Sequence, residues 1–235
     1  MYKRQTHITA ILAPLIFPTY ALYSQDQEKM NQLFLRVLKV VSIFTIPATF
    51  GILALSDEIA SVLLGEVWTP MGPPLKVLVF FGMFAAIAAC TGPLFKAIGK
   101  PNIIFWIMFW KLFLIILFIY PLTTNYGILG TALAVTIPMT LEQLYLWVLV
   151  RRLTGISLTN MFSCLSKPVV ISLVMYTFII LSKTVLPLTS IPLFFAYALF
   201  GMLVYSLGIF IFDKGLIDEI KNLKETKNSP TAEKG

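Results

Sequence analysis

The chain alternates long apolar runs with short clusters of polar and charged residues. The runs cover approximately residues 6–22, 38–56, 75–97, 102–121, 127–150, 168–187 and 191–212. After the first, each run is long enough to cross about 30 Å of hydrocarbon as an α-helix. A barrel strand would alternate apolar and polar positions, whereas residues 105–120 are apolar on every side except at Lys111. The pattern predicts an all-α integral membrane protein, a helical bundle of about six full transmembrane helices plus a partial N-terminal one.

Turn-forming residues separate several of these runs. They are Gly-Pro-Pro at 72–74, Gly-Lys-Pro at 99–101, Thr-Asn at 124–125 and Pro187. Because such short connections make helical hairpins, we expect successive helices to be antiparallel neighbours.

Two further segments are amphipathic. Residues 26–39 place four apolar side chains on one helical face, Met30, Leu33, Phe34 and Val37. Residues 213–227 place four more opposite two lysines: Leu216, Ile217, Ile220 and Leu223 against Lys221 and Lys224. Both segments are predicted to be interfacial helices that lie on a headgroup surface. Residues 228–235 are predicted to be a solvated, frayed end.

The composition excludes a soluble globule. The chain is 58% hydrophobic and 12% charged, and its mean hydropathy is +0.86. Charges fall in clusters too short to leave room for a separate soluble domain. Cys90 and Cys164 have no second Cys or His at ligand spacing, so we interpret both as small apolar fillers and expect neither a disulfide nor a metal site.

The net charge of +7 is best explained as a topology signal rather than a nucleic-acid surface. Thirteen of the 18 Lys and Arg residues fall on one side of the predicted topology, against four on the other and Lys111 inside a span. The positive-inside rule places the richer side in the cytoplasm, with Lys3 and Arg4 as the dissenting pair. The chain then divides into a transmembrane lobe, residues 1–212, and a cytoplasmic amphipathic helix with a disordered tail, residues 213–235. We expect a multi-pass protein of the cytoplasmic (inner) membrane with a cytoplasmic C-terminus.

Enzyme signatures are absent from the sequence, which has no HExxH, nucleophile elbow or P-loop and only one histidine, His7. We therefore predict a protein that is not an enzyme and needs no cofactor. Two ionisable residues remain inside the apolar runs, Lys111 and Glu142. Counted from the cytoplasmic ends of adjacent antiparallel spans, they lie at similar depths of about 14 Å and 12 Å.

Two interpretations of these residues stay open, beside a third in which Lys111 faces elsewhere. Lys111 and Glu142 form one buried ion pair that pins two helices together, or Lys111 lines a polar cavity and attracts an anionic substrate. The interior prolines and glycines are possible hinge positions, because such residues kink helices or allow close backbone contact. They are Pro47, Gly51, Gly92, Pro93 and Pro138.

Several motifs carry a family resemblance. They are Pro18 with Asp26 in a short loop, Pro47 with Gly51 in the next span, Leu63-Leu64-Gly65 with Trp68, Gly99-Lys100-Pro101 after a span, and the small-residue segment YGILGTALA at 126–134. In these motifs, most of them within residues 17–102, the chain resembles the C-terminal half of a polysaccharide or O-antigen flippase. Such flippases are Wzx-like members of the polysaccharide transporter family, in the multidrug/oligosaccharidyl-lipid/polysaccharide (MOP) superfamily.

The resemblance implies one lobe of a two-lobe MOP-type transporter, whose partners are the bilayer, a lipid-linked oligosaccharide and a missing N-terminal lobe or second chain. The implied activity is the flipping of an undecaprenyl-pyrophosphate-linked oligosaccharide across the cytoplasmic membrane by alternating access. An anionic pyrophosphate would give the cavity candidates a purpose: Lys111, Glu142, Lys96 and Arg36.

Three other functions stay open at this stage. A multidrug cation exporter of the same superfamily would favour carboxylates in its cavity. A membrane-embedded glycosyltransferase or polymerase would need a soluble loop or a carboxylate-based sugar site, but the outer connection at 57–74 is predicted to be a short interfacial helix. A non-transporting membrane scaffold is the third.

Overall fold

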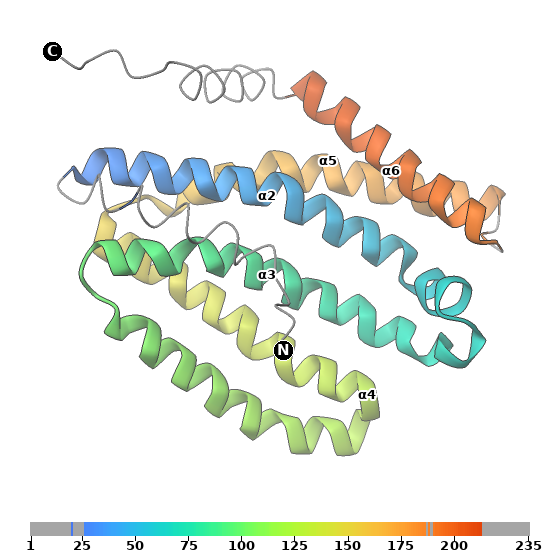
Figure 1. Ribbon diagram of the computed structural model, residues 1–235, viewed down its shortest axis with the longest axis horizontal. Helices are drawn as coiled ribbons and strands as arrows, with labels where there is room; N and C mark the ends of the chain where they lie inside the picture. The colour runs from blue at the N-terminus through green and yellow to red at the C-terminus, as the bar shows by residue number, and fades with distance from the viewer. Residues whose placement is uncertain (1–19, 21–25, 187, 189, 213–235) are drawn as a thin grey trace, which may run out of the picture.

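The computed structural model describes residue 20, residues 26–186, residue 188 and residues 190–212 (Figure 1). The described residues form helices and contain no strand, so the all-α prediction is confirmed. The main helices are α2 (Gln27–Glu58), α3 (Gly72–Ala97), α4 (Asn102–Thr154), α5 (Leu158–Val185) and α6 (Ile191–Phe212). A π-helical turn, Ile59–Leu63, and a 3₁₀ helix, Glu66–Met71, join α2 to α3. All five main helices are long and apolar enough to cross a membrane.

Helix α4 is a hairpin of two spans rather than one straight rod. Its 53 residues would extend about 80 Å if straight, far more than a bilayer needs. The backbone reverses at Gly127, whose φ of 58° and ψ of −133° lie in a region that favours glycine. A Cβ at Gly130 would overlap the carbonyl oxygen of Leu122, so the two arms approach closely only because residue 130 is glycine. Figure 1 shows the first arm, residues 102–126, beside the second arm, residues 128–154.

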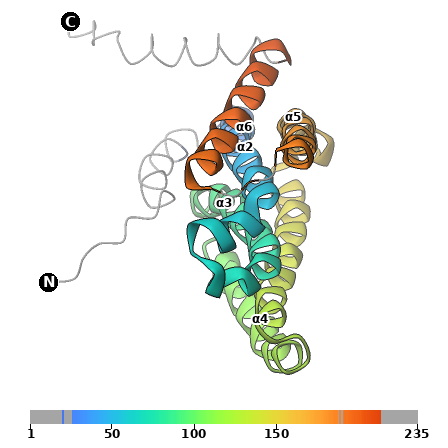
Figure 2. The ribbon, with the colours of Figure 1, turned by 90° about the vertical axis from the view of Figure 1, so that its right-hand side faces the viewer.

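Within the described residues, the two arms of α4 and the other four main helices give six segments long enough to be full spans, in agreement with the sequence pattern. Helix α2 lies at the centre and packs against α3 and α5, while α3 packs against α4 and α5 against α6. Figure 2 shows α6 and the α4 hairpin at opposite edges of the bundle. Successive helices are antiparallel neighbours with one main exception. Helix α5 follows α4 in the chain but packs mainly on α2.

The connections alternate between the two ends of the bundle. The start of α2, the turn between α3 and α4, and the link from α4 to α5 lie at one end (Figure 1, left). The cations of that end include Lys29, Lys100 and Arg151. The link between α2 and α3, the corner at Gly127 and the end of α5 lie at the opposite end, with Lys76 and Lys183. The charge asymmetry of the sequence therefore coincides with the two ends of the helices.

The prediction that residues 26–39 form an interfacial helix on a headgroup surface is wrong. These residues are the first turns of the continuous helix α2, whose N-cap Asp26 accepts a hydrogen bond from the Lys29 backbone N–H at 3.1 Å. Met30 and Phe34 are fully buried in a core shared with α3, α4 and α5. The apolar face exists as predicted, but it packs against protein helices instead of lipid headgroups.

A second core joins α5 and α6 to the far half of α2. Gly201 and Gly208, seven residues apart, let α6 approach α5, because a Cβ at either position would collide with an isoleucine of α5. Helix α5 begins ten residues before the predicted span at 168, so Pro168 lies inside the helix. The run 6–22, apart from the buried Tyr20, and the segment 213–235 lie outside the described residues.

Candidate functional site

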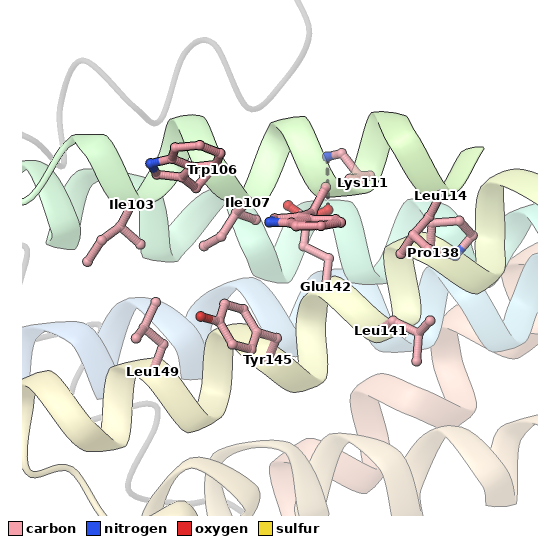
Figure 3. A pocket seen from close by; sticks show the side chains of 11 residues that line it. Ile103, Trp106, Ile107, Lys111, Leu114, Pro138, Leu141, Glu142, Tyr145 and Leu149 are labelled. Carbon is pink, nitrogen blue, oxygen red and sulfur yellow. Dashed lines mark ion pairs between the residues drawn. The ribbon is translucent and has the colours of Figure 1, made fainter. Parts of the chain in front are cut away.

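A groove of about 650 Å³ separates the two arms of α4 (Figure 3). The first arm contributes Ile103, Trp106, Ile107, Trp110, Lys111 and Leu114, and the second Pro138, Leu141, Glu142, Tyr145 and Leu149. Residues 111 and 142 are almost equidistant along the chain from the corner at Gly127, so the hairpin brings them to the same level. The corner thus sets the register of the groove.

Lys111 and Glu142 form an ion pair, which was one of the interpretations that the sequence left open. Lys111 Nζ lies 2.9 Å from Glu142 Oε2, although the contact does not meet the angular requirement of a hydrogen bond. The Glu142 side chain is 9% exposed and that of Lys111 is 26% exposed. Figure 3 shows the pair bridging the groove from one arm to the other. A carboxylate and an ammonium group in a partly buried site attract each other more strongly than in bulk water, and each would be costly to leave without a partner.

Aromatic side chains on the groove walls were missed by the sequence analysis. Trp106, Trp110 and Tyr145 are more than half exposed, and they line the groove from its two arms. Edge-to-face contacts connect the two indoles through Phe109, with ring centroids 5.8 Å and 6.1 Å apart. One signal was available, because tryptophan usually lies at the membrane interface and Trp110 directly precedes the mid-span Lys111.

The other predicted site residues lie away from the groove, except Pro138, which lines it. Arg36 is half-buried in α2, and Lys96 is exposed in the last turn of α3. Gly92 and Pro93 lie inside α3, which remains one helix. The structure therefore brings together Lys111 and Glu142, and it does not bring Arg36 or Lys96 to the same groove.

Pro47 and Gly51 border a second groove, of about 700 Å³, bounded by α2, α5 and α6. Because proline has no N–H, Pro47 leaves the carbonyl of Ile43 without its helical donor. The Tyr205 hydroxyl of α6 donates a hydrogen bond to that carbonyl at 2.7 Å. A tyrosine of one span thus satisfies the backbone group that a proline frees in another.

Two ion pairs lie at the end of the bundle near the link from α2 to α3. Lys183 pairs with Glu58 and also donates a hydrogen bond to the Ala54 carbonyl at 2.8 Å. Lys76 pairs with Asp57 at 2.7 Å, and both of these side chains are about half exposed. The described residues contain no cluster of three or more His, Cys, Asp and Glu side chains that could hold a metal ion.

The described residues define a multi-pass, all-α membrane protein. The family described as "Polysaccharide biosynthesis protein" matches residues 3–73. The fold resembles that of the lipid II flippase MurJ in an inward closed conformation, with a TM-score of 0.65 and 20% sequence identity. The match covers 87% of this chain and 43% of MurJ.

Relatives of known sequence agree with the fold. A membrane protein of unknown function from the cps region of Klebsiella pneumoniae is 25% identical over 217 residues, which cover 92% of this chain and 45% of the relative. The probable low-salt glycan biosynthesis flippase Agl15 of Haloferax volcanii is also 25% identical, over 87% of this chain and 45% of its own. The lipopolysaccharide biosynthesis protein WzxC of Escherichia coli is 28% identical over 58% of this chain and 27% of its own.

These comparisons confirm the resemblance drawn from the sequence motifs. The chain is similar to Wzx-like polysaccharide flippases, and it spans less than half the length of the relatives it matches.

Proposed function

We propose that this chain is one lobe of a transporter that flips an undecaprenyl-pyrophosphate-linked oligosaccharide across the cytoplasmic membrane by alternating access. The cargo would be the repeat unit of O-antigen or another polysaccharide. The observation that carries the proposal is the Lys111–Glu142 ion pair, which lies in a groove on the flank of the bundle. Because charged side chains are costly against lipid tails, this flank should face water or another protein.

The second lobe is the partner that fits this flank. The chain spans 45% of the Klebsiella and Haloferax relatives and 43% of MurJ, so a transporter of their length needs a second half. That half would come from a longer polypeptide or from a second chain. The groove between the arms of α4 then becomes one wall of a cavity between the two lobes.

The charge of the pair favours an anionic cargo. Lys111 is the cation of the groove, and Glu142 holds its ammonium group in position while no substrate is bound. A pyrophosphate that enters the groove offers Lys111 a second acceptor. A cation exporter would need a carboxylate that is free to bind its cargo, whereas Glu142 is already neutralised by Lys111. The described link between α2 and α3 holds only short helical turns, which favours transport over a glycosyltransferase.

The direction of flipping follows from the proposed orientation. The end of the bundle with Lys29, Lys100 and Arg151 is placed in the cytoplasm by the positive-inside rule. Arg36 and Lys96 would then lie near the inner mouth, where they could attract the pyrophosphate before it reaches Lys111. The proposed hinges, Pro47 with Gly51, Gly92 with Pro93, and Pro138, would let the helices bend between inward-open and outward-open forms.

The orientation is tested by reporters in the full-length protein. A cytoplasmic reporter fused after Lys224 should be active, and a reporter of external exposure inserted near Asn125 should be labelled from outside. The opposite result at both positions would invert the topology and the direction of transport.

The function is tested by removing the charge pair without leaving one partner alone. The double variant Lys111→Met with Glu142→Gln should insert and accumulate normally yet lose surface glycan display, since the groove has lost its cation. The matched control is Lys76→Met with Asp57→Asn, which removes a partly exposed ion pair that does not line the groove and should leave display intact. Full glycan display by a folded Lys111–Glu142 double variant would contradict the proposal. It would favour a scaffold in which the pair only holds the two arms of α4 together.

A further inference from the structure

The groove in α4 presents three aromatic side chains beside its charge pair. Trp106 and Trp110 of the first arm are 57% and 56% exposed, and Tyr145 of the second arm is 57% exposed. Figure 3 shows Trp106 and Tyr145 on opposite walls of the groove, both on the side of the ion pair that faces Ile103 and Leu149. Aromatic rings therefore flank the space directly next to Lys111.

The two indoles are fixed by their neighbours on the same helix. Trp106 contacts Phe105 and Phe109 edge to face, each with ring centroids 5.8 Å apart. Trp110 contacts Phe109 and Phe113 in the same way, at 6.1 Å and 5.7 Å. Rings held in this manner lose little conformational entropy when a ligand binds to them.

The polar atoms of these rings have no partner among the described residues. The indole N–H groups of Trp106 and Trp110 make no hydrogen bond to a described residue, and the Tyr145 hydroxyl makes none either. In hydrocarbon an unpaired donor is costly, and buried Tyr and Trp usually find a hydrogen-bond partner. Three unused donors and three open ring faces around one groove match a ligand that is apolar on its faces and rich in hydroxyl groups at its edges.

A sugar ring has this chemistry. The face of an aromatic ring carries partial negative charge and attracts the C–H groups on the apolar face of a pyranose, while the N–H and O–H groups bind its hydroxyl oxygens. Trp106 lies five residues from Lys111, about 7.5 Å along the helix. A sugar attached through its anomeric oxygen to a phosphate held by Lys111 would begin within that distance.

We propose that Trp106, Trp110 and Tyr145 form a carbohydrate subsite that binds the first sugar of the lipid-linked glycan while Lys111 binds its pyrophosphate. The inference rests on the proposed function and adds a second recognition element to it. The two elements divide the labour, since the cation recognises the phosphate and the rings recognise the sugar.

The test compares two probes that differ only in the sugar. The full-length protein in lipid nanodiscs is titrated with undecaprenyl pyrophosphate and with the same lipid bearing one N-acetylglucosamine. The wild-type protein should bind the sugar-bearing lipid more tightly. The double variant Trp106→Leu with Trp110→Leu should bind the sugar-bearing lipid about tenfold more weakly, which is the combined loss expected for two ring contacts. Its affinity for undecaprenyl pyrophosphate should not change. Lys111→Met with Glu142→Gln should weaken binding of both.

Two controls separate stacking from packing. Tyr120→Leu removes a ring of the same arm that is 77% exposed and does not line the groove, and it should change neither affinity. Trp106→Tyr with Trp110→Tyr keeps the ring faces and should retain most of the preference for the sugar-bearing lipid.

The outcomes that contradict the subsite differ from those that contradict the function. Equal losses for both probes in the leucine variant would show that the rings contact the lipid or support the fold, and no loss for either would show that they bind nothing. Both results overturn the subsite while leaving the flippase proposal in place. If the wild-type protein binds neither probe, the proposed function fails, and the subsite with it.

Discussion

Two grooves of similar size flank the bundle, and they differ in the kind of polar contact that they contain. The groove between the arms of α4, about 650 Å³, contains an ion pair between two side chains, Lys111 and Glu142. The groove between α2, α5 and α6, about 700 Å³, is apolar, and its cross-helix polar contact joins the Tyr205 hydroxyl to the Ile43 carbonyl.

The difference lies in what each polar group can do if the contact breaks. Lys111 is a long, partly exposed side chain, so an anion or water can replace Glu142 as its partner. The Ile43 carbonyl is a fixed backbone group that Pro47 has deprived of its donor, and surrounding hydrocarbon offers no replacement. In the charged groove Lys111 can therefore exchange Glu142 for another acceptor, whereas the contact in the apolar groove holds α6 against α2.

The largest expected effect comes from breaking the ion pair on one side. Glu142→Gln leaves Lys111 as an unpaired cation and should lower the free energy of unfolding by about 3 kcal/mol, the low end of the range for buried pairs because Lys111 is partly exposed. Adding Lys111→Met should restore most of that loss. Thermal unfolding in detergent, followed by the accessibility of Cys90, measures both changes. Equal instability of the single and double variants would mean that the pair is not a coupled unit.

The corner that aligns the charged groove should respond almost as strongly. Gly130→Ala forces a Cβ onto the Leu122 carbonyl, and such overpacking typically costs 1–3 kcal/mol. We expect about 2 to 3 kcal/mol here, because backbone atoms cannot move aside as a flexible side chain does. The matched control is Gly82→Ala in α3, where a Cβ meets nothing within 4 Å and should be neutral or slightly stabilising. A harmless Gly130→Ala in the same unfolding assay would show that the arms do not need this close approach.

Much of the charged groove was predictable because it depends on local features. Lys111 and Glu142 are ionisable residues in apolar runs joined by a short turn, and equal depth follows from counting residues on either side of that turn. The sequence held one hint of the aromatic walls, the position of Trp110 directly before Lys111. The pattern alone does not tell which face of a uniformly apolar helix lines a groove, so the other rings were not predicted.

Contacts between distant spans were outside the reach of the sequence. The position of Pro47 predicts a carbonyl without a donor at Ile43, but not that Tyr205, 162 residues away, supplies the hydroxyl. The packing of α5 on α2 is likewise a choice among apolar surfaces of similar composition. The amphipathic pattern at 26–39 was real, and only its partner was mistaken, because lipid headgroups and neighbouring helices select the same pattern.

The apolar groove should show a smaller effect, with a distinct dependence on background. Tyr205→Phe removes the donor to the Ile43 carbonyl and should cost about 1–2 kcal/mol. In a Pro47→Ala background residue 47 regains its N–H, so the carbonyl has a helical donor and the cost of Tyr205→Phe should fall well below 1 kcal/mol. The double-mutant cycle in the unfolding assay measures this coupling. Identical costs in both backgrounds would mean that Tyr205 does not compensate for the proline.

The smallest effect is expected at Asp26, which lies outside both grooves and sets the baseline for a polar contact in water. The Lys29 backbone N–H, assisted by the Lys29 side chain, holds the pKa of Asp26 below its ordinary value. The ionised carboxylate therefore stabilises the start of α2 at pH values above the unfolded pKa of about 4, and this contribution is lost as the pH falls through the lower folded pKa. Asp26→Asn keeps a side-chain oxygen at the N-cap but cannot titrate. The melting temperature of the wild-type protein should exceed that of the variant slightly at pH 7, and the gap should close as the pH falls below about 4. A gap that widens on acidification would reverse the assigned direction of the pKa shift.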